Sequence, residues 1–195
     1  MAVSKTRELL VDVARQLFAK NGLENTTMND IASEAGKGRR TLYTYFKSKE
    51  EIYYTVIETE LRRLFERMND VAQRDMPPED KIVLLIFTHL EAVKEIVYRN
   101  GNLRAEFFRN IWGVEKVRKN FDRSEMAIFR RVLNEGVDKR VFDIKNVRLT
   151  TELTHYFLKG CETPYIYGHL TTNVEEIHTF VRRLVRRSIG HHYMD

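Results

Sequence analysis

The sequence predicts an all-α protein with a small three-helix N-terminal domain followed by a larger helical domain. Only three prolines and nine glycines occur in 195 residues, and long stretches contain neither, which favours long helices over the turn-rich pattern of an all-β protein. Apolar residues recur at three-to-four spacing along most of the chain, as in amphipathic helices. We therefore expect about nine helices in two domains, 1–48 and 49–195.

The first two helices are expected within residues 6–36. The first begins near Thr6 and ends at Asn21-Gly22, where glycine accepts the left-handed conformation that closes a helix. Its apolar face is formed by Leu9, Leu10, Val13, Ala14, Leu17 and Phe18. The second, very short helix begins at Thr27, whose hydroxyl is spaced to cap it together with Asp30.

A third helix is expected from Arg39 to Phe46, after a turn through Lys37 and Gly38. Leu42 and Phe46 face inward, so the outward face carries Lys37, Arg39, Arg40, Thr41, Thr44 and a tyrosine. Two short helices joined by a glycine-containing turn and braced by a longer helix form the helix-turn-helix plan, whose second helix enters the DNA major groove. Arginine can donate two hydrogen bonds to guanine, and hydroxyls serve phosphates. The pattern predicts sequence-specific binding to double-stranded DNA.

The charge distribution agrees with a polyanionic partner without proving one. The net charge is +5, and residues 1–50 hold nine Lys and Arg against six Asp and Glu. Beyond them, Ser48 and Lys49 are typical of the start of a fourth helix, where free amides and a lysine would hold another phosphate.

Three motifs in this region resemble the DNA-binding domain of the TetR family of bacterial repressors, over about a quarter of the chain. They are A-x-x-L-F-x-x-x-G in residues 14–22, T-x-x-x-I-A-x-x-A-G in 27–36 and T-L-Y-x-Y-F-K-S-K-E in 41–50. The resemblance implies that Lys37–Phe46 lies in the groove and that Arg39 and Arg40 read bases. It also implies backbone contacts for the positions of Thr27, Tyr43, Tyr45 and Lys49. The predicted DNA-binding residues are Thr27, Lys37, Gly38, Arg39, Arg40, Thr41, Tyr43, Thr44, Tyr45 and Lys49.

Two departures and two alternatives accompany this assignment. Family members often carry serine at the position of Gly38 and a small residue at that of Arg40, so the operator contacts cannot be transferred from a relative. Arg39 and Arg40 also fit a solvated charged face, and the two tyrosines fit either core support or phosphate contact.

The body is expected to be helical throughout. The predicted helices are Ser48–Asp75, Glu79–Arg99, Asn102–Trp112, Lys116–Gly136, Lys145–Gly168 and Val174–Gly190, with a break near Gly113. The resemblance implies that the last two helices form a homodimer, whose two-fold symmetry matches palindromic operators. Core packing within one subunit is the competing explanation. The predicted dimer residues are Leu149, Leu153, Tyr156, Phe157, Ile177, Phe180, Val181 and Leu184.

A small-molecule effector site in the body is expected from the resemblance. Apolar and aromatic residues of the kind that line such pockets are Phe87, His89, Phe107, Phe108, Trp112, Met126, Phe129, Cys161 and Tyr165. Each also fits ordinary core. Pro164 is expected to kink its helix and open a cavity beside Cys161 and Tyr165.

Other classes of protein and site are disfavoured. The chain has no phosphate-binding glycine loop, no H-E-x-x-H and no G-x-S-x-G, so an enzyme is not expected, although distant residues can assemble a site. A helical interaction protein is a third possibility. The chain has one cysteine, no apolar run long enough to span a bilayer and no signal peptide. We therefore expect a cytoplasmic protein without a membrane partner, a metal site or a cofactor. His191-His192 is a weak metal signal, and Arg182, Arg183, Arg186 and Arg187 fit a solvated face. The expected function is repression released by an effector.

Overall fold

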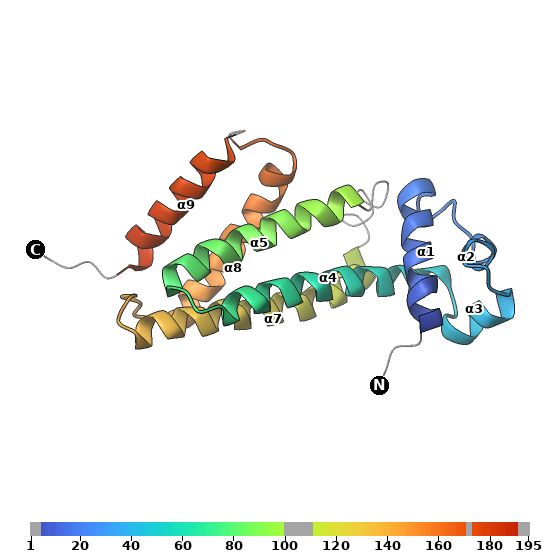
Figure 1. Ribbon diagram of the computed structural model, residues 1–195, viewed down its shortest axis with the longest axis horizontal. Helices are drawn as coiled ribbons and strands as arrows, with labels where there is room; N and C mark the ends of the chain where they lie inside the picture. The colour runs from blue at the N-terminus through green and yellow to red at the C-terminus, as the bar shows by residue number, and fades with distance from the viewer. Residues whose placement is uncertain (1–4, 100–110, 171–172, 191–195) are drawn as a thin grey trace, which may run out of the picture. The chain divides into compact units, whose positions relative to one another are not determined.

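The computed structural model describes residues 5–99, 111–170 and 173–190, without the side chains of 111–117. Its regular structure within these ranges is entirely helical, which confirms the expected fold class (Figure 1). The helices are α1 (Lys5–Asn21), α2 (Met28–Glu34), α3 (Arg39–Tyr45), α4 (Lys49–Gln73), α5 (Pro78–Arg99), α7 (Ile111–Asp138), α8 (Val147–Ile166) and α9 (Val174–Ile189). The expected helix Asn102–Trp112 falls mostly outside the described residues.

The predicted break near Gly113 is wrong. Helix α7 runs without interruption from Ile111 to Asp138 and passes through Gly113. A glycine inside a helix costs only about 1 kcal/mol relative to alanine, which neighbouring helix-forming residues can offset. The other boundaries agree with the sequence within about two residues, which is the usual uncertainty of a helix end.

The chain divides into two compact units. Unit 1 comprises residues 1–62 and 95–120, and unit 2 comprises residues 63–94 and 121–195. Helices α4, α5 and α7 therefore contribute residues to both units.

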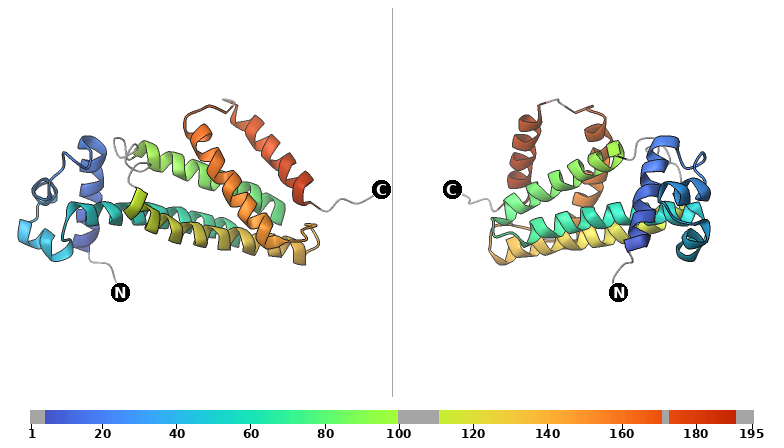
Figure 2. Two further views of the ribbon diagram at one scale, coloured as in Figure 1. Left: turned by 180° about the vertical axis from the view of Figure 1, so that it is seen from behind. Right: turned by 45° about the vertical axis from the view of Figure 1, so that its right-hand side comes forward.

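Helices α1, α2 and α3 in unit 1 enclose a small core with the first turns of α4, which pass alongside α1 in each view (Figures 1 and 2). The Phe18 and Tyr53 rings meet edge to face with centroids 6.2 Å apart. The Arg7 guanidinium lies 4.9 Å from the centroid of Phe46, at the end of α3. The largest fully buried side chains here are Leu10, Phe18, Ile31, Leu42, Phe46, Ile52 and Tyr53. This packing fixes the orientation of α3.

Unit 2 is a helical bundle in which α5, α7 and α8 pack together and α9 contacts α5 (Figure 2). The Phe87 ring of α5 stacks on His178 of α9 with centroids 3.4 Å apart. Along α9, Val181 and Val185 are buried, whereas Phe180 and Leu184 are exposed. Helix α9 therefore has apolar residues on two faces.

Contacts among five residues hold the segment after α7 against the end of α9. We call these residues the 142 latch: Gly136, Phe142, Asp143, Ile189 and Gly190. A Cβ on Gly136 would clash with the ring of Phe142, so the buried ring occupies the space that a side chain would need. The amides of Val141 and Phe142 donate to Gly136 O, and the amide of Asp143 donates to Ile189 O at 3.0 Å. Phe142 and Gly190 form an isolated antiparallel bridge.

Candidate functional site

The N-terminus of α2 has the predicted cap. Thr27 Oγ1 accepts a hydrogen bond from the Asp30 amide at 3.1 Å, and Asp30 Oδ2 accepts one from the Thr27 amide at 2.8 Å. The Thr27 hydroxyl also donates to Asp30 Oδ2 at 2.7 Å. These bonds from the Thr27 side chain and backbone lower the pKa of the Asp30 carboxyl. The Thr27 hydroxyl and the Asp30 carboxylate together satisfy two amides at the start of α2.

Replacing Thr27 with alanine should therefore lower the free energy of unfolding of unit 1 by about 1 kcal/mol, because the Asp30 amide loses the hydroxyl that caps it. Urea denaturation followed by circular dichroism measures this loss. Thr27→Ser is the control, because serine keeps the hydroxyl. Equal stability of the parent chain and Thr27→Ala would contradict the capping role.

The start of α3 carries a cationic ridge, which we define as Lys37, Arg39 and Arg40. All three side chains are exposed, while Leu42 and Phe46 are buried behind them. The Arg39 guanidinium lies 5.5 Å from the centroid of the Tyr43 ring, which is itself 43% exposed. Among the residues that the structure describes, no carboxylate lies within ion-pair distance of the ridge. The three cations thus face solvent, and no described acidic group neutralises them.

Other predicted DNA contacts already have partners within unit 1. The Thr44 hydroxyl donates to Arg40 O at 3.0 Å, and the side chains of Thr41 and Tyr45 are half-buried. Lys49 Nζ donates to Leu23 O at 2.8 Å and to Glu24 O at 3.1 Å, an interaction that the sequence pattern did not indicate. Lys49 therefore ties the loop before α2 to α4.

The N-cap of α3 is Gly38, which makes no side-chain capping bond and has φ −65° and ψ 145°. A Cβ there would meet only Thr41 Oγ1, at 3.9 Å. Neither sterics nor backbone conformation requires glycine at this position, so a serine is compatible with the fold.

The predicted effector-pocket residues lie mostly in the core of unit 2. Phe87, His89, Phe129 and Tyr165 are buried, and Met126 is half-buried. Phe107 and Phe108 lie outside the described residues, as does the Trp112 side chain. Cys161 is half-buried, and burial raises the pKa of its thiol.

Pro164 lies in the last turn of α8, two residues before the helix ends. Beside it, the Tyr165 hydroxyl donates to Glu91 Oε1, and burial together with this bond raises the pKa of the phenol. Tyr165 thus binds a carboxylate of α5.

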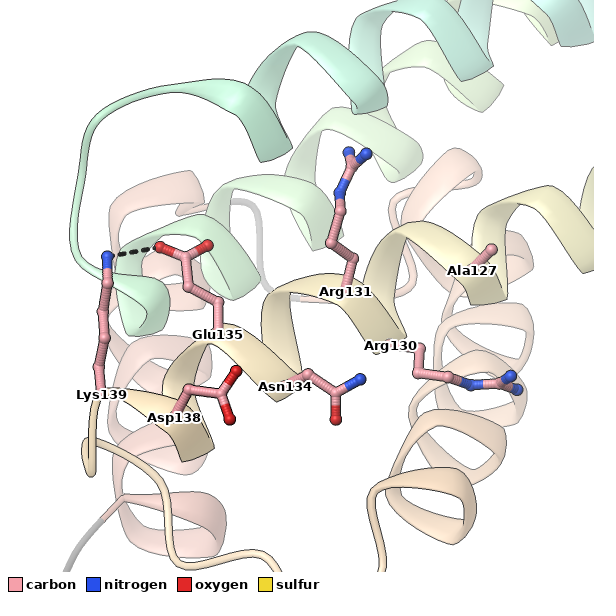
Figure 3. Close-up of a pocket in the computed structure, with 7 residues that line it drawn as sticks. All are labelled: Ala127, Arg130, Arg131, Asn134, Glu135, Asp138 and Lys139. Atoms are coloured by element: carbon pink, nitrogen blue, oxygen red, sulfur yellow. Dashed lines mark hydrogen bonds and ion pairs between the residues drawn. The ribbon is translucent and has the colours of Figure 1, made fainter.

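Two hollows in unit 2 are lined by residues that do not belong to the predicted effector pocket. One, of about 640 Å³, lies along α7, where Lys139 pairs with Glu135 and Arg130 and Arg131 project from the helix (Figure 3). The other, of about 320 Å³, is a mainly apolar groove between α5, α8 and α9. Its lining is Ile82, Ile86, Thr150, Leu153, Thr154, Phe157, Val181, Leu184, Val185, Ser188 and Ile189.

A buried polar cluster, absent from the sequence-based expectations except for His89, joins α5, α7 and α8 within unit 2. The two ring nitrogens of His89 pair with Glu125 Oε1 and, at 2.9 Å, with Glu162 Oε1. Glu125 Oε2 lies 2.9 Å from His155 Nδ1. We call the set the α5–α7–α8 cluster: His89, Asp122, Glu125, His155, Lys159 and Glu162.

The electrostatics of this cluster favour ionised groups. Burial opposes ionisation of Glu125, but the charge of His89 and hydrogen bonds from His155 and His89 outweigh it and lower the pKa to about 2. Burial opposes protonation of His89, yet the two glutamates raise its pKa. Lys159 Nζ lies 3.0 Å from Glu162 Oε1 and 3.2 Å from Asp122 Oδ1. The interior of unit 2 therefore contains a network of charges.

The predicted dimer residues on α8 and α9 are mainly exposed. Leu153 is 60% and Phe180 63% exposed, and Leu149, Tyr156, Phe157 and Leu184 also face solvent. Ile177 is half-buried and Val181 is buried. An exposed group of this many large apolar side chains is typical of an interaction surface.

No helix among the described residues is long and apolar enough to cross a membrane.

Comparisons with known proteins agree with this arrangement. Residues 10–54 match the family model for bacterial regulatory proteins of the tetR family. The chain is 35% identical over 136 residues to the HTH-type transcriptional repressor KstR2 of Mycolicibacterium smegmatis, covering 67% of this chain and 64% of that protein.

Two solved structures share the fold over nearly the whole chain. A transcriptional regulator from Cytophaga hutchinsonii superposes with a TM-score of 0.76 at 22% identity, covering 94% of this chain and 98% of that one. The regulator FadR from Bacillus subtilis, solved in complex with stearoyl-CoA, superposes with a TM-score of 0.66 at 18% identity, covering 91% and 96%.

Proposed function

Because the chain belongs to the TetR family of bacterial transcriptional regulators, we propose that it is a homodimeric repressor that an effector releases from a palindromic operator. The observation that carries this proposal is the exposed cationic ridge at the start of α3. Residues 1–48 form the DNA-binding domain, and residues 49–195 form the regulatory and dimerisation domain. The ridge enters the major groove, with Arg39 and Arg40 at base edges and Lys37 at a phosphate.

The remaining DNA contacts are assigned to groups beside the ridge. Tyr43 is exposed and serves a phosphate, whereas Thr44 is exposed but its hydroxyl donates to Arg40 O. Thr27, Thr41, Tyr45 and Lys49 support the ridge from neighbouring positions, since their polar atoms already hold unit 1 together or lie partly buried.

The effector is a small molecule bound within residues 49–195. Support comes from the stearoyl-CoA complex of the Bacillus subtilis relative, so long-chain acyl-CoA thioesters are the first compounds to test. An effector releases DNA only if it binds the DNA-free conformation more tightly than the DNA-bound one.

Fluorescence anisotropy tests the DNA-binding proposal. The probe is an inverted repeat from the DNA upstream of the chain's own reading frame, compared with a scrambled duplex at the same salt concentration. We expect binding to the repeat that is at least about a thousandfold tighter than to the scrambled duplex. Equal affinity for both duplexes would overturn sequence-specific regulation.

The homodimer is proposed to form through the exposed faces of α8 and α9. Leu153→Glu and Phe180→Glu should each convert the dimer to a monomer, because a carboxylate would lose its hydration at the centre of an apolar interface. Sedimentation velocity measures the change in mass. Asn134→Glu, at an exposed position of α7 (Figure 3), should stay dimeric. Dimers in both α8 and α9 variants would place the interface elsewhere.

A further inference from the structure

The α5–α7–α8 cluster contains a set of side chains suited to a metal ion. One ligand atom from each of Asp122, Glu125 and His155 lies within 4.8 Å of the other two. Glu125 is fully buried, and His155 is 6% exposed. Because metal–ligand bonds are about 2.0–2.2 Å long, the three ligand atoms would have to move only slightly closer to one another to hold one ion. Carboxylate and imidazole come from two helices that already pack together.

The sequence places these ligands on facing sides of the two helices. Asp122 and Glu125 are three residues apart on α7, and Glu125 lies in the buried stripe between Phe121 and Ile128. On α8, His155 lies seven residues before Glu162, so both face the same side. A charged residue in a buried helix stripe is rare unless it has a partner.

The buried polar atoms of the cluster are already paired by charge. His89 Nδ1 pairs with Glu125 Oε1, and Asp122 Oδ1 lies 3.2 Å from Lys159 Nζ. His89 and Glu125 are each fully buried. Buried polar atoms normally have a hydrogen-bond partner or a bound ion. A metal ion bound here therefore has to displace part of this pairing.

From this geometry we infer that unit 2 binds one divalent first-row transition-metal ion through Asp122, Glu125 and His155. An imidazole with two carboxylates, without thiolate, suits Zn²⁺, Co²⁺, Ni²⁺, Fe²⁺ or Mn²⁺ better than Mg²⁺ or Ca²⁺, which prefer oxygen ligands alone. Glu162 and His89 flank the set and would hold or orient the ligands. This site is separate from the ridge and does not depend on DNA binding.

Lys159 offers a way to distinguish a metal site from a purely structural network of ion pairs. Its ammonium lies between Asp122 and Glu162 and competes with a metal ion for the same carboxylates. Removing this charge should strengthen metal binding. If the cluster were only a structural network of ion pairs, removing Lys159 would leave the negative charges of Asp122 and Glu162 less well neutralised. It would not create affinity for a metal ion.

The test is a titration of the full-length chain, freed of metal with a chelator and dialysed. Zn²⁺ binding is followed by calorimetry, and Co²⁺ binding by visible absorbance. We expect one ion per chain and no comparable binding of Mg²⁺. His155→Ala should weaken binding by about a hundredfold or more, since even residues that only support a ligand contribute about 10–100-fold. Lys159→Met should tighten binding by about tenfold.

Controls separate the site from other causes. His191→Ala/His192→Ala should bind as the parent does, which excludes the terminal histidines. Circular dichroism must show His155→Ala folded; if it is not, His155→Gln replaces it. No saturable binding by the parent chain, binding that survives loss of His155, or binding unchanged or weakened in Lys159→Met would each overturn the inference. All of these outcomes are measured without DNA, so they are independent of the regulator proposal.

Discussion

Arg39→Ala should weaken operator binding by about 1–3 kcal/mol, and Arg40→Ala should do the same, if each arginine reads a base. Both side chains are exposed at the first turn of α3, where a helix-turn-helix protein contacts base edges. The loss should be much smaller on a scrambled duplex, because phosphates are common to all sequences. Fluorescence anisotropy on both duplexes measures the difference.

Two comparison variants show which part of the effect is sequence-specific. Lys37→Ala should weaken binding to both duplexes similarly and reduce the slope of log affinity against log salt by about 1. Arg182→Ala removes an exposed arginine of α9 and should leave both affinities unchanged. An equal loss on both duplexes in the Arg39 and Arg40 variants would reassign these residues to phosphate contact.

Glu125→Ala should lower the free energy of unfolding by about 3–5 kcal/mol, because it leaves a buried positive charge without one of its two partners. Glu125 is fully buried and contacts both His89 and His155. Urea denaturation in the presence of a chelator measures the loss. Glu152→Ala is the matched control, because its pair with Arg148 is exposed and should contribute about 0.3–0.5 kcal/mol. Similar losses in both variants would contradict the role of the buried pair.

The same substitution should change the response to acid. The pKa of Glu125 falls from 4.5 to about 2 in the folded protein. Its contribution to stability is therefore present above pH 4.5 and is lost as the pH falls toward 2. The groups that face Glu125 and lower its pKa are His89, His155 and Lys159. Denaturation at several pH values should show a flatter profile for Glu125→Ala over this range.

Elements whose cause is local were predictable from the sequence. Gly22 has the left-handed φ of 83° expected at the end of α1, and Thr27 forms the expected cap with Asp30. Leu42 and Phe46 are buried as the helical spacing requires. Each of these features depends on neighbours within a few residues, so the pattern contains the necessary information.

Features that depend on distant residues were not predictable. Lys49 binds carbonyls more than twenty residues away, and no periodicity reveals that contact. The pairing of His89 with Glu125 and Glu162 also has no local signal, because these residues lie 36 and 73 residues further along the chain. A partial signal existed, since Glu125 and His155 are polar residues at positions that helical spacing assigns to the buried side.

The 142 latch limits where the protein can be engineered. The bonds from Asp143 to Ile189 and the ring over Gly136 join the end of α7 to the end of α9. An epitope inserted between residues 139 and 146, or new termini created there by circular permutation, would separate these ends. The short turn between α4 and α5 is the better place for either change, because its backbone hydrogen bonds, from Arg74 to Val71 and from Lys81 to Pro77, stay within four residues.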